Sequence, residues 1–124
     1  MKTHSLWHSF ECAFAGLIEV VRGGRNAKIH VGVALAVIVT GCCLNITRTD
    51  WAILTLTIGA VFSAEAANTT IEALVDLVSP EHHELARQAK DCAAGAVLVM
   101  AIAAVVVGLL ILGPPFAAAI GRSF

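Results

Sequence analysis

Two long stretches of this chain contain no Asp, Glu, Lys or Arg, and they constrain the fold more than any other feature. One covers residues 29–47 and the other covers residues 92–121. About 20 apolar residues in a helix cross a hydrocarbon layer roughly 30 Å thick, so each stretch is long enough to span a membrane. The whole chain of 124 residues is 58% hydrophobic and only 14% charged, which is unusual for a soluble domain. The sequence therefore predicts an all-α integral membrane protein, organised as a single domain over residues 1–124.

A third apolar stretch begins at Trp51, a residue type that favours the membrane interface. The three crossings are predicted at about 29–47, 51–78 and 92–112. Thr49 and Asp50 are suited to cap the second of these helices. Proline is disfavoured inside a helix, so Pro80 is expected to end the second crossing and the Gly-Pro-Pro at 113–115 to end the third.

The amino-terminal residues 4–22 have the pattern of an amphipathic helix. Apolar side chains recur at three- and four-residue spacing, at Leu6, Trp7, Phe10, Phe14, Leu17, Ile18 and Val21. This segment is too mixed in polarity to cross a bilayer, so we expect a helix lying on the membrane surface. The paired glycines at 23–24 are expected to separate it from the first crossing.

A row of polar side chains interrupts the second crossing. At about 100° per residue, Glu65, Asn68, Glu72 and Asp76 fall within one narrow stripe of a helix. Carboxylates are costly in hydrocarbon, so an inward-facing row of them predicts a functional site. The alternative is the end of a helix that has left the membrane and carries a solvated polar face.

The basic residues predict which way the chain crosses the membrane. With three crossings, one side carries Lys2, Arg22, Arg25, Lys28, Arg87 and Lys90. The other side carries only Arg48 and Arg122. The positive-inside bias assigns the first group, and with it the acidic stripe, to the cytoplasm where ATP is found. A net charge of −1 and the lack of a basic stripe give no reason to expect nucleic acid as a partner.

These residue types suit phosphoryl transfer at the membrane surface. Glu72 is suited to hold Mg²⁺, and Lys90 beside Asp91 is suited to neutralise a phosphate. Glu65 lies about 10 Å deeper along the helix, where it could accept a proton from a lipid hydroxyl while Asn68 orients it. Catalysis of this reaction consists mainly of positioning and charge neutralisation. A different class, a small transporter with Glu65 as its proton site, is the alternative.

Two histidine positions are open to simpler interpretations. The pair His82-His83 would either touch a nucleotide or belong to a solvated loop. His30, at the start of the first crossing, is interpreted as an interface residue rather than as a ligand.

Three motifs resemble those of a known family. Glu65-Ala-Ala-Asn68-Thr-Thr-Ile-Glu72-Ala-Leu-Val-Asp76 resembles the E-x-x-N-[ST]-x-I-E-x-x-V-D signature of the prokaryotic diacylglycerol kinases. The segment 89–98 is similar to their A-K-D-x-A-A-G-A-V-L motif. The segment 25–30 is similar to the R-N-x-[KR]-x-H stretch of the Gram-positive branch, which includes undecaprenol kinases. The resemblance covers nearly the whole chain, from about Ser9 to Pro115.

The resemblance implies a lipid kinase of the bacterial plasma membrane, typically homotrimeric, whose site faces the cytoplasm. Such an enzyme transfers the γ-phosphate of MgATP to the hydroxyl of a lipid such as undecaprenol or diacylglycerol. It implies that Glu65 is the general base and Glu72 a metal ligand, with Asn68 and Asp76 supporting the site. The remaining implied site residues are Glu81, His82, His83, Lys90 and Asp91 for the nucleotide and Ala94 for the lipid.

One position departs from the family pattern. The family usually has a second metal-binding Glu directly before the R-N pair, and Gly24 occupies that position here. Mg²⁺ would then depend on Glu72, phosphate oxygens and water, with Glu19 as a substitute only if the surface helix sits differently. A degenerate family member that binds nucleotide without turnover is therefore a further alternative.

Overall fold

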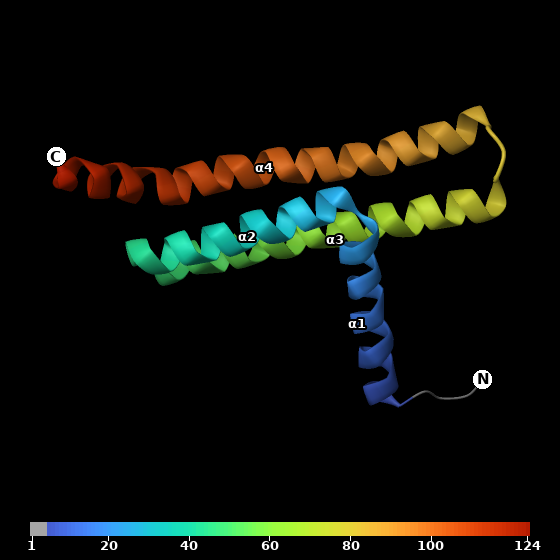
Figure 1. The fold of residues 1–124 in the computed structure, drawn as a ribbon, viewed down its shortest axis with the longest axis horizontal. Coiled ribbons are helices and arrows are strands. Elements are labelled where there is room, and N and C mark those ends of the chain that lie inside the picture. Colours follow the sequence, from blue (N-terminus) through green and yellow to red (C-terminus); the bar gives the residue numbers. More distant parts are fainter. Residues whose placement is uncertain (1–4) are drawn as a thin grey trace.

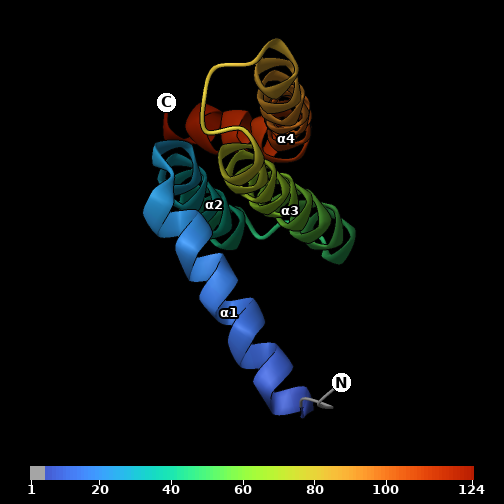
Figure 2. The same cartoon turned by 90° about the vertical axis from the view of Figure 1, so that its right-hand side faces the viewer.

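The computed structural model describes residues 5–124, and its four regular elements are all α-helices (Figure 1). They are α1 (Leu6–Gly23), α2 (Arg25–Leu44), α3 (Arg48–Val78) and α4 (Glu84–Ser123). The helices α2, α3 and α4 run side by side, and α1 leaves them at a steep angle (Figures 1 and 2). The prediction of an all-α protein is confirmed, while His4 and Lys2 lie outside the described residues.

The three helices that run side by side, α2, α3 and α4, qualify as membrane spans by length and hydropathy. At 1.5 Å per residue, the 20, 31 and 40 residues of α2, α3 and α4 give lengths of about 30, 46 and 60 Å. Few apolar side chains are buried within the described chain, namely Val20, Ala27, Leu54, Val61, Ala93 and Val97. Most of the apolar surface is therefore turned outward, as expected for helices whose surroundings are lipid or other protein chains.

The break between α1 and α2 falls at Gly24, as predicted. Its backbone is extended (φ −118°, ψ 124°), and it caps both the end of α1 and the start of α2. The helix α2 begins at Arg25, four residues before the predicted crossing starts. The charge-free stretch marks where lipid contact begins, whereas Arg and Lys are good helix formers that extend the same helix into the interface.

The start of α3 corrects the predicted cap. Thr47 is the N-cap: its Oγ1 accepts a hydrogen bond from the backbone N of Asp50 (3.1 Å), and Asp50 Oδ2 accepts one from the backbone N of Thr47 (3.2 Å). The prediction of Thr49 and Asp50 as the cap of a helix from Trp51 was wrong for Thr49 and for the start, whereas Asp50 does take part in the cap. A reciprocal capping box needs the two side chains three residues apart, and Thr47 with Asp50 has this spacing.

Gly41 fixes the approach of α2 and α3 at this end of the bundle. A Cβ atom added at Gly41 would lie 2.8 Å from the Trp51 ring, so the indole packs directly on the glycine backbone. Asn45 then ends α2 in the left-handed conformation (φ 52°), with its backbone N–H donating to the Gly41 carbonyl. The turn between the two helices is therefore short and closely packed.

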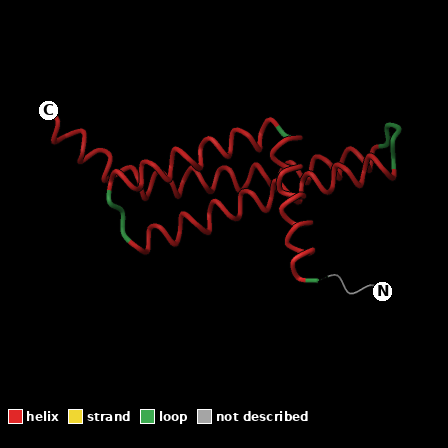
Figure 3. Tube along the Cα trace, turned by 60° about the horizontal axis from the view of Figure 1, so that its bottom comes forward, coloured by secondary structure: helices red, strands yellow, loops and turns green. Residues whose placement is uncertain are grey.

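The helix α4 continues through Pro114 and Pro115 to Ser123, so the prediction that these prolines end it was wrong. Its last turns change direction relative to the rest of the helix (Figure 3). Proline removes a backbone donor and kinks a helix, but helical turns on both sides keep the other backbone groups bonded. In an apolar environment an unwound segment would leave more groups unsatisfied, which favours a bent helix over a loop.

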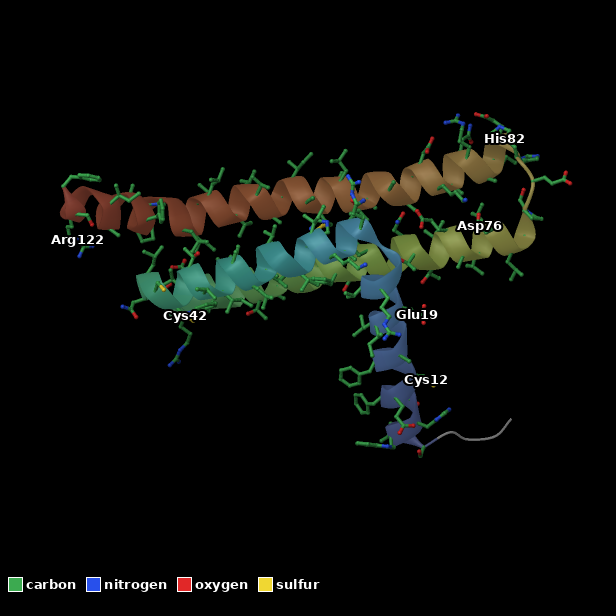
Figure 4. The ribbon with its side chains drawn as sticks, viewed as in Figure 1. Cys12, Glu19, Cys42, Asp76, His82 and Arg122 are labelled. Carbon is green, nitrogen blue, oxygen red and sulfur yellow. The ribbon has the colours of Figure 1, made fainter. Side chains whose placement is uncertain are left out.

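The antiparallel order of α2, α3 and α4 brings the predicted cytoplasmic segments to one end. At that end the hairpin between α3 and α4 projects beyond the start of α2 (Figure 1). We call residues 72–91, which include this hairpin, the α3–α4 arm. Asp76 and His82 lie on the arm, while Cys42 and Arg122 lie at the opposite end of the molecule (Figure 4).

Candidate active site

The deepest part of the candidate site is a buried contact between α2 and α3. Glu65 is the buried charged residue of the described chain, with 5% of its surface exposed. His30 Nε2 lies 3.1 Å from Glu65 Oε1, and the two side chains are 20% and 6% exposed. The angle at this contact is not that of a hydrogen bond, and Oε1 has no other donor among residues 5–124.

An apolar groove of about 480 Å³, lined at one end by His30, runs between α2, α3 and α4. Its polar lining residues are His30, Thr40 and Thr57. Each threonine hydroxyl donates at 2.7 Å to the carbonyl four residues earlier in its own helix, which satisfies it locally. The groove therefore has apolar walls and one polar end, formed by His30 beside Glu65.

The residues that line the groove come from three helices. On α2 they are Ile29, His30, Val33, Ala34, Val37 and Thr40. On α3 they are Leu54, Thr57, Ile58 and Val61. On α4 they are Ala101, Ala104, Val105, Gly108, Leu109, Leu112, Gly113 and Phe116. Ala94 is exposed on α4 and is not among them, so its predicted lipid contact is not part of this groove.

Farther out on α3, Asn68 and Glu72 form a second part of the site. Asn68 Nδ2 donates to Glu72 Oε1 at 3.3 Å. Asn68 Oδ1 is buried without a hydrogen-bond partner, whereas Glu72 is exposed. The two side chains together offer hard oxygen ligands of the kind that Mg²⁺ prefers. Among residues 5–124, however, no group of three or more His, Cys, Asp or Glu side chains is gathered for a metal ion.

On the arm, an ion pair joins α3 to α4. Lys90 Nζ donates to Asp76 Oδ1 at 2.5 Å, with the two side chains 40% and 66% exposed. Lys90 precedes the charge-free part of α4, and its hydrogen bond to Asp76 raises the pKa of its ammonium group above the usual value. The hydrogen bond holds Lys90 where it faces the end of the acidic stripe.

A smaller pocket of about 250 Å³ lies between the loop and the first turns of α4. It gathers most of the predicted nucleotide residues, and its lining includes Asp76, Glu81, His82, His83 and Lys90. His83 has a structural role as well, because its Nδ1 accepts a hydrogen bond from the backbone N of Leu85 (3.1 Å) and caps α4. Four predicted residues from the loop and from α4 are thus brought beside Asp76 of the acidic stripe.

Asp91, a predicted nucleotide residue, pairs with Arg87 on the first turns of α4. Asp91 does not line this pocket: its Oδ2 accepts from Arg87 Nη1 at 2.6 Å. Arg87, which also pairs with Glu84, lines the pocket and was not predicted as a site residue. Its spacing of three residues from Glu84 and four from Asp91 was visible in the sequence and predicts such pairs on a helix.

The interpretation of His30 as an interface residue did not include its contact with Glu65. The residue is partly buried and faces Glu65 from the neighbouring helix. The signal that could have identified it is its position at the end of the R-N-x-K-x-H stretch, one helical turn inside α2.

Gly24, the residue that departs from the family pattern, has room for a larger side chain. A Cβ atom added at Gly24 would lie 3.4 Å from Ala27 Cβ and 3.4 Å from the Val20 carbonyl oxygen, which are ordinary contacts. Glu19, the suggested substitute ligand, is exposed on α1 (Figure 4).

Comparison with known proteins identifies the family. Residues 11–112 match the model of the prokaryotic diacylglycerol kinases. The chain is 44% identical over 106 residues to the undecaprenol kinase of Bacillus subtilis, covering 86% of each chain. It is 46% identical over 108 residues to a diacylglycerol kinase of Synechocystis (86% of this chain and 62% of the relative). It is also 36% identical over 86 residues to the diacylglycerol kinase of Escherichia coli K12, covering 69% of this chain and 70% of the relative. With its three candidate spans, the chain belongs to the prokaryotic diacylglycerol kinase family and is an ATP-dependent, multi-pass membrane lipid kinase.

Proposed function

We propose that this kinase transfers the γ-phosphate of MgATP to the hydroxyl of a polyprenol such as undecaprenol, with diacylglycerol as the second candidate substrate. The observation that carries the proposal is the apolar groove lined at one end by His30, whose imidazole contacts the buried carboxylate of Glu65. A long lipid chain fits such a groove, because apolar walls favour it and a single polar end fixes its hydroxyl. The similarity to the undecaprenol kinase of Bacillus subtilis supports the polyprenol.

In the proposed reaction, Glu65 is the general base. The lipid hydroxyl oxygen forms a bond to the γ-phosphorus, and the bond from that phosphorus to the oxygen bridging the β- and γ-phosphates breaks. The hydroxyl proton passes to the Glu65 carboxylate, and ADP leaves with the bridging oxygen. The products are a lipid phosphate monoester and ADP. Burial of Glu65 supports this role, because excluding water strengthens interactions at the reacting atoms.

The nucleotide is proposed to bind on the α3–α4 arm. The pocket beside the loop offers Glu81, His82 and His83 for the base and ribose and Lys90 for the phosphates. Asp76 would hold Lys90, and Asp91 would act on the same side through Arg87. Glu65 lies eleven residues from Asp76 along α3, or about 16 Å, so the triphosphate would lie along the stripe toward the groove.

Mg²⁺ would be held by Glu72, with Asn68 beside it. The buried and unpartnered Oδ1 of Asn68 supports this assignment, since such an oxygen lacks a compensating contact in the protein. When bound, the ion neutralises charge on the phosphates during transfer. Because Gly24 supplies no carboxylate, phosphate oxygens and water would complete the coordination, as Mg²⁺ commonly allows.

The arrangement in the membrane is also proposed. The helix α1, which leaves the other three at a steep angle, has exposed apolar residues, including Trp7, Phe10 and Phe14. It would lie in the cytoplasmic interface, with the arm in the cytoplasm. The family resemblance predicts a homotrimer of single-domain chains, in which partners and lipid cover the outward apolar surface. Ala94 would contact lipid outside the groove. Chemical cross-linking in native membranes, with ladders ending at three copies, would test the trimer.

The test of function is transfer of labelled phosphate from MgATP in mixed micelles, with undecaprenol and diacylglycerol offered separately. We expect lipid phosphate from undecaprenol in preference to diacylglycerol. A preference for diacylglycerol would reverse the substrate assignment. Nucleotide binding without any lipid product would support the degenerate alternative motivated by Gly24. The transporter alternative is not favoured, because the chain belongs to a family of lipid kinases.

A further inference from the structure

We propose that His30 is a positioning residue for Glu65. The imidazole Nε2–H holds one carboxylate oxygen, Oε1, and thereby directs the other toward the lipid hydroxyl. The inference rests on the proposed role of Glu65 as the base. It adds a residue that acts from a different helix, and the sequence motif of the acidic stripe contains no such partner.

The buried carboxylate of Glu65 needs a partner that compensates its charge. Glu65 must be ionised to accept a proton, yet it is 5% exposed and contacts His30, a lining residue of an apolar groove. An isolated carboxylate is costly to hold in such surroundings unless a hydrogen-bond donor or a cation faces it. His30 Nε2 lies 3.1 Å from Oε1, which has no hydrogen-bond partner in the described chain, so a small rotation would make this nitrogen the donor.

The distance between His30 and Glu65 allows a hydrogen bond to form when substrate binds. The separation of 3.1 Å falls in the range of N–H···O hydrogen bonds, although the angle does not. Catalytic hydrogen bonds are often poorly aligned before substrate binds and tighten in the complex. Occupation of the groove by a lipid chain would press against His30, which lines it, and against Val61, one turn before Glu65. Alignment of the imidazole would therefore accompany substrate binding.

A role for His30 in packing alone does not explain its position. A histidine kept only to fill space would be replaceable by an apolar residue, as the remaining lining of the groove is apolar apart from two locally satisfied threonines. His30 is instead the lining residue that faces an unsatisfied buried oxygen. Its removal would leave Glu65 Oε1 without any nearby donor and its carboxylate free to turn.

The test compares His30→Leu with His30→Gln in the full-length protein, using labelled phosphate transfer to the lipid that the wild type accepts. For His30→Leu we expect kcat to fall about 100-fold, the loss typical of a misplaced reacting group. The KM for ATP should stay unchanged, since the nucleotide pocket lies on the arm. For His30→Gln, whose side-chain amide can donate from a similar position, we expect most of kcat to return. Thr55→Val, which removes an exposed hydroxyl of α3 outside the groove, is the matched control and should match the wild type.

Two results would overturn the inference. One is full kcat in a folded His30→Leu protein. The other is a His30→Gln protein that folds and is as inactive as Glu65→Gln, since a retained donor should suffice. If His30→Leu does not fold, His30→Gln decides alone. Glu65→Gln assayed alongside separates the two proposals: turnover retained there rejects the base, whereas its loss with a fully active His30→Leu rejects only the role of His30.

Discussion

Among residues 5–124, two contacts between an acidic and a basic side chain join different helices, and their surroundings differ sharply. Glu65 and His30 join α3 to α2 at the end of the apolar groove, with side chains 6% and 20% exposed. Asp76 and Lys90 join α3 to α4 on the arm, with side chains 66% and 40% exposed. Both contacts involve the same stripe of α3, and they lie eleven residues apart. The stripe therefore passes from a dry environment to a solvated one within three helical turns.

This difference in burial predicts different roles for the two ends of the site. Charges in water are screened, so Lys90 can exchange Asp76 for a phosphate group at little cost. A buried pair is different, because removing one partner leaves the other uncompensated. We therefore expect the groove end to set the rate of chemistry and the arm to set nucleotide affinity. Substitutions at the two ends of the site should therefore affect different kinetic parameters.

The largest effect is expected for Glu65→Gln. The substitution keeps the shape but removes the base, so kcat should fall between about 100- and 10,000-fold. Affinity for ATP, measured by equilibrium binding, should remain that of the wild type because the nucleotide pocket is elsewhere. Glu11→Gln, which changes an exposed carboxylate on α1, is the matched control. A Glu65→Gln enzyme with normal kcat would show that the base lies elsewhere.

A smaller loss is expected for Glu72→Ala, at the boundary between the two environments. Activity at fixed Mg²⁺ should fall about 10- to 100-fold, and a higher Mg²⁺ concentration should recover part of it. The measurement is a Mg²⁺ titration of phosphate transfer. Glu19→Ala serves as the control and should leave the titration unchanged. If Glu19→Ala shifts the midpoint and Glu72→Ala does not, the metal is held from α1 instead.

On the arm, Lys90→Gln should act on binding rather than on rate. We expect the KM for ATP to rise about tenfold, the effect of one charge-assisted phosphate contact, with a smaller change in kcat. The wild-type KM should also rise with added salt, while the salt dependence should weaken in the variant. Arg48→Gln, at the opposite end of the bundle, is the control. A drop in kcat with an unchanged KM would contradict the proposed division.

Much of the fold followed from local patterns. The two charge-free stretches and the apolar stretch from Trp51 correspond to the three long apolar helices, and Gly24 and Pro80 located two of the breaks. The helix ends were less predictable, because hydropathy reports where lipid contact begins and not where a helix begins. Capping by Thr47 depends on a reciprocal pair of hydrogen bonds, and continuation through Pro115 depends on the apolar surroundings.

The candidate site was predictable along one helix but not between helices. The stripe from Glu65 to Asp76 follows from helical periodicity alone. The contacts of His30 with Glu65 and of Lys90 with Asp76 depend on how far each neighbouring helix is shifted along α3. No local pattern encodes that shift, which is set by packing such as Trp51 on Gly41. Lys90 was found through its motif, whereas His30 was assigned to the interface.

The smallest effect is expected for Gly24→Glu, which restores a carboxylate where the family usually has one. Gly24 has an ordinary extended backbone, and a Cβ atom there meets neighbours only at 3.4 Å, so the side chain should enter without rearrangement. An added oxygen ligand should lower the Mg²⁺ concentration needed for half-maximal activity by a few-fold, about what one exposed carboxylate supplies. Gly24→Gln is the matched control, since it has the same length without the charge. A titration that is unchanged in Gly24→Glu would mean that Glu72, Asn68 and the phosphates already complete the site. In that case the charged side chains that bind Mg²⁺ and the phosphates all lie on α3 and α4. The helix α1 then contributes only its position on the membrane.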